Sequence, residues 1–236
     1  MQYKLLIIIP CYNEEASIAA LLKQLLQLSL PNQFHATIAV INDCSKDSTA
    51  NIVSGYPVVL LNLPVNLGIG GAMQTGYRYA FENGFDFAVQ MDGDGQHPPT
   101  ELHKLLEHWQ QTQASVVIGS RFIVKQGYQS SFMRRGGIGY LHWLNKLLTG
   151  IHVYDSTSGF RLFDKKAIAI AAKNYPDEYP EPESIVIFSK QGLVIAETAV
   201  VMQERQGGQS SIRHFSQLYY MVKVTIAIFF SFIRKK

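Results

Sequence analysis

Short apolar runs alternate with segments of helical periodicity through the first half of this chain, and that alternation limits the folds open to it. Residues 5–9 are continuously apolar, which is typical of a strand covered on both faces. Apolar side chains then recur at helical spacing over residues 18–28, and Pro31 follows. Repeated strand–helix pairs predict an α/β fold with a Rossmann-like, mostly parallel sheet and helices on both faces. Further strands are predicted at residues 36–41, 58–61, 85–90 and 116–119.

The size and composition fit one large α/β domain. The chain has 236 residues, 47% of them hydrophobic and only 17% charged, which is enough apolar material for a full core. Its 21 basic and 18 acidic residues give a net charge of +3, which makes no case for binding nucleic acid. Two cysteines do not form a disulfide framework in a chain of this length, so we predict a reducing, cytosolic location. The apolar run at residues 5–9 is too short for a signal peptide.

The strand–helix alternation weakens after Arg121. Glycines and basic residues gather in residues 127–139, a polar segment covers residues 155–161, and prolines mix with acidic residues over residues 175–183. We predict that these three segments are loops. We divide the chain into a main domain, residues 1–214, and a C-terminal amphipathic helix, residues 215–236.

Polar clusters follow four of the predicted strands. The carboxyl ends of parallel strands meet at one edge of a sheet, so these clusters are expected to line a single crevice. The clusters are residues 10–15, 42–48, 66–71 and 92–97.

Asp92 and Asp94 are the sharpest feature of these clusters. One glycine separates the two carboxylates just past a buried strand, so both can turn toward a single cation. Hard oxygen ligands at such a turn suit Mg²⁺ or Mn²⁺, which keep other positions for water and phosphate oxygens. The alternative is a solvated Asp-Gly turn, a common turn sequence. The presence of the other three clusters favours the metal site.

The remaining clusters leave alternatives open. Asp43 can accept hydrogen bonds from a base or ribose, or it can cap a helix. Tyr12 can pack on a base, or it can be an ordinary surface tyrosine. Gly68, Gly70 and Gly71 can let the backbone approach a ligand, or they can form a tight turn into a helix.

Taken in order, the four clusters resemble those of family 2 glycosyltransferases, which have the GT-A fold. The matching residues are 9–15, 42–49, 66–68 and 92–98, all in the first half of the chain. The resemblance implies a nucleoside-diphosphate sugar as donor. Nucleotide contacts are expected from Pro10, Tyr12, Glu14 and Asp43, and we place Asn66 and Gly68 in the same donor site.

The resemblance also implies that Asp92 and Asp94 form the family's Asp-Xaa-Asp site for Mg²⁺ or Mn²⁺, with Gln96 nearby and Asp94 in the catalytic set. Asn42 stands where the family often has Asp, and Cys44 stands where it often has Gly. These departures leave the preference for a nucleotide base open.

The second half resembles dolichyl-phosphate mannose synthases and bacterial polyprenyl-phosphate sugar transferases. The resemblance rests on residues 119–122, 155–161, 204–205 and 208–212. We predict that the three loops build the acceptor side. The resemblance implies that Arg121 and Arg205 meet phosphate groups of the donor or the acceptor, as suits a planar, always charged guanidinium. Arg205 can instead pair with Glu204 at the surface.

Two features that the sequence lacks bear on processivity and on stereochemistry. The chain lacks the Gln-Xaa-Xaa-Arg-Trp motif of processive relatives, so we expect one sugar per event. The fold family and the absence of an obvious protein nucleophile suggest direct displacement with inversion at the anomeric carbon.

The acceptor decides whether the reaction needs a base. A sugar hydroxyl needs a carboxylate to take its proton, and Glu183 or Glu181 could serve, although both could equally be polar loop residues. The wider family often has a Glu-Asp pair there, and this chain has Ser184 in place of the Asp. A phosphate acceptor is largely ionised at neutral pH and needs no base. The missing Asp therefore favours a polyprenyl phosphate over a sugar hydroxyl of a growing cell-surface glycan.

The C-terminal residues are predicted to hold the protein against a membrane. The apolar stretch 218–233 contains Lys223 and is shorter than the about 20 residues that a spanning helix needs. Its Tyr and Phe side chains are typical of interfaces, and the basic residues 234–236 suit anionic headgroups. We predict a peripheral protein on the cytoplasmic face of the cell membrane. The alternative is a helix packed on the domain itself or on a partner chain, and a membrane-embedded partner subunit would satisfy both.

Two other functions fit the same crevice. A sugar nucleotidyltransferase would carry a glycine-rich loop followed by Arg and Lys, where this chain has Pro-Cys-Tyr-Asn at residues 10–13. An inactive donor-binding subunit of a glycosyltransferase complex would not need both Asp92 and Asp94. We therefore predict an active glycosyltransferase.

Overall fold

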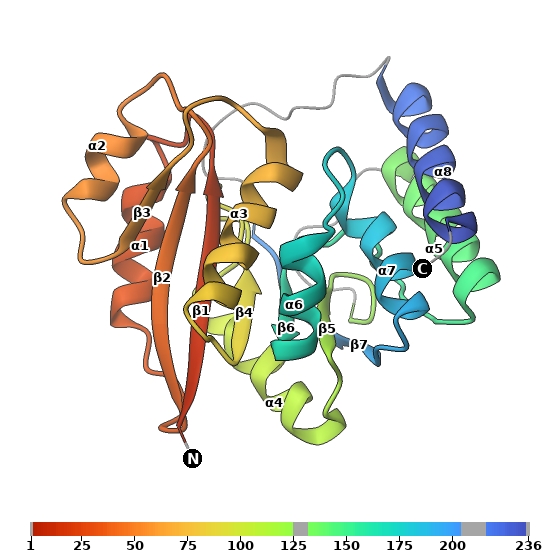
Figure 1. The fold of residues 1–236 in the computed structure, drawn as a ribbon, viewed down its shortest axis with the longest axis horizontal. Coiled ribbons are helices and arrows are strands. Elements are labelled where there is room, and N and C mark those ends of the chain that lie inside the picture. Colours follow the sequence, from red (N-terminus) through yellow and green to blue (C-terminus); the bar gives the residue numbers. More distant parts are fainter. Residues whose placement is uncertain (1, 125–131, 204–215, 235–236) are drawn as a thin grey trace.

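One seven-stranded sheet organises the chain, in the order β3-β2-β1-β4-β6-β5-β7 (Figure 1). The computed structural model describes residues 2–124, 132–203 and 216–234. The predicted α/β fold with a mostly parallel sheet is confirmed. The strands are β1 (Tyr3–Cys11), β2 (Phe34–Asn42), β3 (Val59–Asn62), β4 (Phe87–Gln90), β5 (Val116–Ser120), β6 (Arg161–Asp164) and β7 (Ile195–Ala199).

Strand β1 lies inside the sheet, as its continuously apolar sequence predicts. It pairs in parallel with β2 on one side and with β4 on the other. Its side chains alternate between two core layers, so that Leu5 and Ile7 pack on one face while Leu6 and Ile8 pack on the other. Both faces of this strand are therefore withdrawn from water.

Helices cover both faces of the sheet. Helices α1 (Ile18–Gln27), α2 (Thr49–Ser54) and α4 (Leu102–Thr112), the last preceded by a short 3-10 turn, pack their apolar side chains into one layer. The other layer is formed by α3 (Gly68–Glu82), α6 (Lys165–Lys173) and α7 (Pro180–Lys190).

The three segments predicted as loops are partly regular. The prediction is confirmed for residues 155–160 and 175–179 and is wrong for residues 132–139, 161 and 180–183. Residues 132–139 begin helix α5 (Phe132–Thr149), where a Cβ at Gly137 would lie 3.2 Å from the sulfur of Met221, so the glycine allows close helix packing. Arg161 begins β6, which is antiparallel to both β4 and β5. Pro180 begins α7, since proline is well tolerated in the first helical turn.

The C-terminal helix α8 (Ser216–Ile233) packs one face on the domain. Val224 and Ile228 are buried against Leu141 of α5 and Val186 of α7. The amine of Lys190 donates to main-chain carbonyls in the last turn of α8, including that of Phe232 at 2.7 Å, and so caps the helix. None of the helices in the described ranges is long and apolar enough to cross a membrane.

Candidate active site

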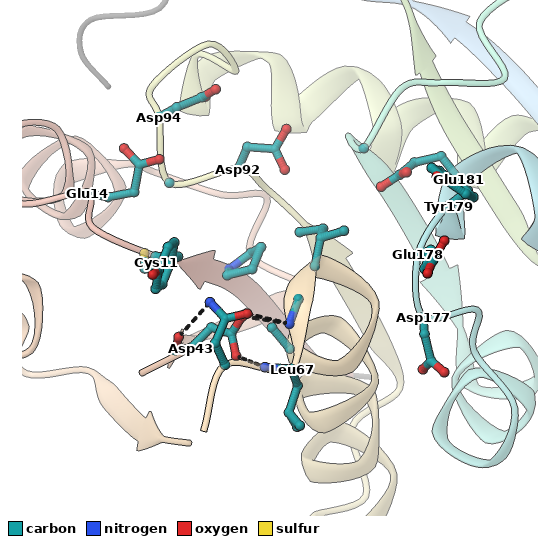
Figure 2. A pocket seen from close by; sticks show the side chains of 18 of the residues that line it. Cys11, Glu14, Asp43, Leu67, Asp92, Asp94, Asp177, Glu178, Tyr179 and Glu181 are labelled. Atoms are coloured by element: carbon teal, nitrogen blue, oxygen red, sulfur yellow. Dashed lines mark hydrogen bonds between the residues drawn. The ribbon is translucent and has the colours of Figure 1, made fainter. Parts of the chain in front are cut away.

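A pocket of about 1100 Å³ opens at the edge of the sheet where β1, β2 and β4 end (Figure 2). Its walls come from the polar clusters that follow these strands, from the start of α3, and from α7 and α8. Most of the predicted donor-site residues line it together, namely Pro10, Tyr12, Glu14, Asp43, Asn66, Gly68, Asp92 and Asp94.

Asp92 and Asp94 stand on a tight turn after β4. Asp94 is buried, and its Oδ1 accepts a hydrogen bond of 3.0 Å from the backbone N–H of Gln96, across Gly95 in the left-handed conformation. Gln96 itself is not among the described residues that line the pocket. The side chain of Asp92 is 34% exposed and therefore accessible from the pocket.

The donor set at this turn fits a hard divalent cation. Nowhere in the part of the chain that the structure describes do three or more His, Cys, Asp or Glu side chains converge on one point. Two carboxylates with the remaining positions open are what Mg²⁺ requires when it binds through substrate phosphates and water. A Cβ at Gly159 would lie 3.2 Å from an Asp92 oxygen, so glycine keeps the space beside this carboxylate clear.

Ser17 ties Glu14 to the aspartate turn, a link that the sequence did not reveal. Its hydroxyl lies 3.0 Å from Oε2 of Glu14 and 2.8 Å from the carbonyl oxygen of Gly93. Ser17 is buried and directly precedes α1. The glutamate and the turn therefore share one anchor, which only their approach in space could show.

His97 is a buried neutral side chain behind Asp92. Its Nδ1 lies 3.8 Å from Oδ2 of Asp92, and its ring stacks on Phe160 with centroids 5.0 Å apart. Burial lowers the pKa of His97 to about 4. The imidazole is thus uncharged at neutral pH and adds no positive charge to the pocket.

Asp43 anchors the start of α3. Its two carboxylate oxygens accept the backbone N–H groups of Leu67 at 2.7 Å and Gly68 at 2.9 Å. These helix N-terminal amides lack intrahelical partners, so a carboxylate stabilises them. Asp43 nevertheless lines the pocket, and its contact with a nucleotide stays a prediction.

The structure explains the Asn42 departure from the family pattern but not the Cys44 departure. Cys44 has φ of +58°, a left-handed conformation in which glycine carries no steric cost. Asn42 donates from its amide to Asn62 over 2.8 Å and accepts the N–H of Ser45. An aspartate at this position would lack the donor that reaches Asn62.

Gly70 is needed for packing within the protein. A Cβ there would lie 2.1 Å from the carbonyl oxygen of Pro176 and 2.2 Å from that of Asp177. The N–H of Gly70 donates to Asp177 over 3.1 Å. The glycine therefore joins the start of α3 to the segment before α7, rather than opening the backbone to a ligand.

Of the two candidate bases, Glu181 lines the pocket and Glu183 does not. Glu183 is hydrogen-bonded to Ser231 of α8, and its role as a base stays a prediction. The two residues lie on different sides of one helical turn, which the predicted loop could not distinguish. Burial raises the pKa of both carboxyls.

Glu181 is positioned by a chain of buried hydrogen bonds. Gln90 donates to its Oε1 over 3.2 Å. The hydroxyls of Tyr77 and Tyr175 both donate to the side-chain oxygen Oε1 of Gln90. The side-chain nitrogen of Gln90 therefore faces the glutamate. The fully buried Arg161 donates to the main-chain carbonyl of Glu181 at 2.9 Å and opposes the upward pKa shift of the carboxyl.

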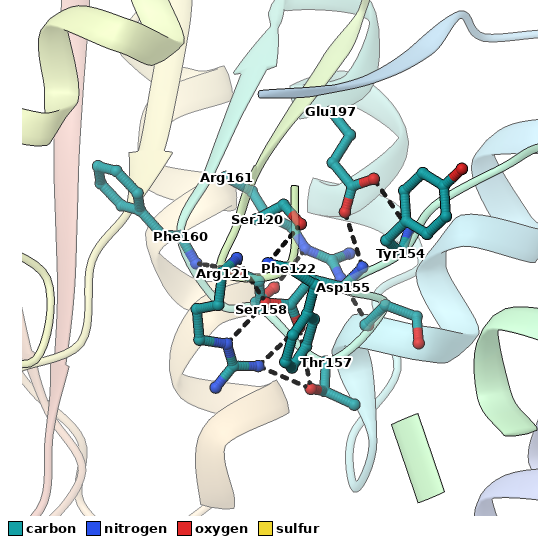
Figure 3. A network of polar contacts seen from close by, with 11 residues as sticks. Ser120, Arg121, Phe122, Tyr154, Asp155, Thr157, Ser158, Phe160, Arg161 and Glu197 are labelled. Carbon is teal, nitrogen blue, oxygen red and sulfur yellow. Dashed lines mark hydrogen bonds and ion pairs between the residues drawn. The ribbon is translucent and has the colours of Figure 1, made fainter. Parts of the chain in front are cut away.

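Arg121 forms a buried ion pair (Figure 3). Its Nε and one terminal nitrogen each lie 2.6 Å from an oxygen of Asp155, and Thr157 accepts a third bond. Glu197 holds this loop by accepting the N–H groups of Tyr154 and Asp155. Arg121 is not among the described lining residues, so its contact with a phosphate stays a prediction, and Arg205 lies outside the described residues.

Comparison with known proteins matches this architecture. Residues 6–169 match the model of glycosyl transferase family 2. The chain is 30% identical to a UDP-N-acetylglucosamine–dolichyl-phosphate N-acetylglucosaminyltransferase of Methanococcus voltae, with 82% of this chain and 83% of that protein covered. It is 28% identical to an undecaprenyl-phosphate mannosyltransferase of Micrococcus luteus, with 89% and 87% covered.

Solved structures share the fold at low sequence identity. Mannosyl-3-phosphoglycerate synthase from Rubrobacter xylanophilus superposes with a TM-score of 0.72 at 16% identity, covering 97% of this chain and 74% of that one. Glucosyl-3-phosphoglycerate synthase from Mycobacterium tuberculosis, solved with Mn²⁺ and UDP-glucose, gives 0.71 at 18% identity, covering 98% and 79%. The chain therefore belongs to glycosyltransferase family 2 and is a glycosyltransferase with the GT-A fold.

Proposed function

We propose that this enzyme transfers one sugar per event from a nucleoside-diphosphate sugar to a polyprenyl phosphate, with inversion at the anomeric carbon. The observation that carries the proposal is the pair of relatives named for dolichyl and undecaprenyl phosphate, which match over more than four fifths of both chains. The pocket at the carboxyl ends of β1, β2 and β4 supports it, because both predicted aspartates and the predicted nucleotide contacts line one space.

The donor side is assigned to the wall that contains Asp43, Asp92 and Asp94. The two aspartates after β4 would hold Mg²⁺ or Mn²⁺, which would neutralise charge on the diphosphate leaving group when bound. Tyr12 is 44% exposed and lines the pocket, so its ring is free to pack on a base. Asn66 and Gly68 extend the same wall at the start of α3.

The acceptor side is assigned to the segments after Arg121. A polyprenyl phosphate carries an ionised oxygen that can attack the anomeric carbon without a protein base. Arg121 and Arg205 remain the proposed phosphate contacts. For Arg121, the phosphate would have to bind a guanidinium that already contacts Asp155 and Thr157.

The membrane surface is assigned to α5 and α8 at the cytoplasmic face. The outer side of α8 exposes apolar side chains, with Phe229 53% and Phe230 61% exposed, although the inner side packs on the domain. Trp143 of the neighbouring α5 is 55% exposed. Such amphipathic helices with aromatic side chains are typical of interfacial binding, and basic residues 234–236 follow. A membrane-embedded partner subunit would use the same surface.

The experiment is a donor screen followed by a transfer assay. Purified full-length protein with Mn²⁺ is tested by thermal shift against UDP-, GDP- and dTDP-sugars, since a ligand that binds the folded state raises the melting temperature. The stabilising donor is then incubated with undecaprenyl phosphate, and the anomeric coupling constant of the product is measured by NMR. A β-linked product from an α-linked donor is expected. A retained configuration, or no lipid-linked product, would refute the proposal.

Transfer to a sugar hydroxyl of a cell-surface glycan is the second candidate. The specific observation in its favour is Glu181, a pocket carboxylate whose pKa is raised by burial and which can accept a proton. A glycan acceptor that is glycosylated when undecaprenyl phosphate is not would establish this alternative. Donor turnover with either acceptor would exclude an inactive binding subunit.

A further inference from the structure

Helix α8 supplies part of the pocket wall as well as an exposed apolar face. Tyr220 and Lys223 line the pocket from this helix, beside Glu178 and Tyr179 from the segment before α7. Val224 and Ile228 seat the same helix in the core, which fixes the position of Lys223. The C-terminal helix is therefore a component of the site.

Lys223 carries the only positive charge among the pocket-lining residues that the structure describes. Its amine lies 2.9 Å and 3.3 Å from the two carboxylate oxygens of Glu178, and 5.0 Å from the centre of the Tyr219 ring. The hydrogen bond with Glu178 raises the pKa of Lys223, so the amine is charged throughout the neutral range. The charged amine of Lys223 can bind an anion, whereas the carboxylates that line the rest of the pocket repel one.

The contact between Lys223 and Glu178 is easily exchanged. The side chain of Glu178 is 63% exposed and that of Lys223 is 38% exposed, so water screens the pair and solvates either partner when the other leaves. A phosphate monoester carries more charge than one carboxylate and offers three acceptor oxygens. It can therefore compete with Glu178 for the amine.

The position of this pair separates it from the donor wall. Figure 2 shows Glu178 and Tyr179 across the pocket from Asp43 and Glu14. A diphosphate held through Asp92 and Asp94 would thus leave Lys223 to a second anion. The exposed apolar face of α8 lies on the same helix, so a lipid chain attached to that anion has an apolar surface to follow.

We propose that Lys223 binds the phosphate of the acceptor and that Glu178 occupies the amine until this phosphate replaces it. The inference rests on the proposed function in one respect, that the acceptor is a phosphate ester. Lys223 and Glu178 together then select a dianionic acceptor, because a neutral alcohol cannot displace the glutamate.

The test measures binding of farnesyl phosphate, with farnesol as the uncharged control, to the full-length protein. Lys223→Met should weaken farnesyl phosphate binding at least tenfold, leave farnesol unchanged, and leave the affinity for UDP with Mn²⁺ within twofold. Lys223→Arg should restore most of the loss. Lys166→Met, an exposed lysine on α6, is the matched control and should have no effect.

Glu178→Gln gives the sharper test, because loss of folding cannot imitate a gain. This variant should bind farnesyl phosphate more tightly, by about threefold or more, since the competing carboxylate is gone. Equal affinity of wild type and Lys223→Met for farnesyl phosphate would overturn the proposal, as would a parallel loss of UDP binding.

A second probe, 3-phosphoglycerate, distinguishes failure of the proposed lipid acceptor from failure of the proposed phosphate contact at Lys223. If wild type binds 3-phosphoglycerate through Lys223 but does not bind farnesyl phosphate, the subsite stands and the lipid acceptor fails. If wild type binds neither phosphate ester, the subsite itself is refuted.

Discussion

The amide nitrogen of Gln90 lies 3.2 Å from Oε1 of Glu181 and thereby joins the end of β4 to the first turn of α7. The hydroxyls of Tyr77 and Tyr175 donate to Oε1 of Gln90 and so fix the orientation of its side-chain amide. Glu181 is consequently held at the pocket wall by a residue only two positions before Asp92. The turn of Asp92 and Asp94 and the candidate base Glu181 therefore both adjoin Gln90 at the end of β4.

Glu181→Gln should stabilise the protein increasingly as the pH rises. Burial raises the pKa of Glu181 in the folded state, so its stabilising contribution is complete below the unfolded pKa and is lost as the pH rises through the folded pKa. Glutamine keeps the acceptor for Gln90 and cannot ionise. Urea unfolding from pH 4 to pH 8 should show a free-energy difference, variant minus wild type, that grows with pH. A constant difference across this range would contradict the pKa shift.

Asp92→Asn and Asp94→Asn should each reduce transfer about a hundredfold or more, which corresponds to at least ~2.7 kcal/mol of transition-state stabilisation. Asparagine keeps the shape of the side chain, so the fold should be unaffected by circular dichroism. Initial rates over a Mn²⁺ titration provide the measurement. Asn83→Asp, a polar change at the exposed end of α3, is the control. Full turnover by wild type in EDTA would exclude the metal role.

Asp155→Ala should destabilise the fold by about 3–5 kcal/mol, because it leaves the Arg121 guanidinium buried without its counter-charge. Urea unfolding provides the measurement. The double variant with Arg121→Met should lose less stability than the sum of the two single variants. Additive losses would mean that the ion pair is not coupled in the folded protein.

Phe230→Ser and Trp143→Ser should each weaken binding to vesicles of phosphatidylglycerol and phosphatidylcholine by about tenfold, since burying such a side chain contributes roughly 1.5–3 kcal/mol. Val194→Ser is the matched control, because Val194 is 59% exposed and lies outside α5 and α8. Cosedimentation at two salt concentrations separates the apolar contribution from the electrostatic one. If Phe230→Ser and Trp143→Ser bind vesicles as tightly as the Val194→Ser control, α5 and α8 do not form the membrane-binding surface.

The sequence predicted the donor half of the fold well, because its signals are local. A strand such as residues 5–9 must be apolar throughout when both faces are covered, and the polar cluster that follows must lie at the sheet edge. Asp92 and Asp94 could be placed beside Asp43 for the same reason. None of this requires knowledge of distant contacts.

The second half was harder because its determinants are contacts between distant residues. Arg161 looked like a loop residue since it is charged, yet its guanidinium is fully buried and bonded to main-chain carbonyls and to Ser184. Glu181 and Glu183 have the same sequence environment, and only the direction of the α7 turn separates them. The glycines of α5 suggested irregular backbone, but Gly137 serves the approach of α8.

The reversed strand β6 has a consequence for how the chain is made. Among the described residues, one edge of β4 is paired only with β6, which follows it after β5 and α5. Strand β5 in turn pairs with β6 and β7. A chain emerging from the ribosome therefore carries an unpaired β4 edge until residue 164 has been synthesised. Unpaired edges of apolar strands invite association with other chains. Synthesis arrested within α5 should accordingly yield an aggregation-prone fragment, although that fragment already contains every residue of the aspartate turn.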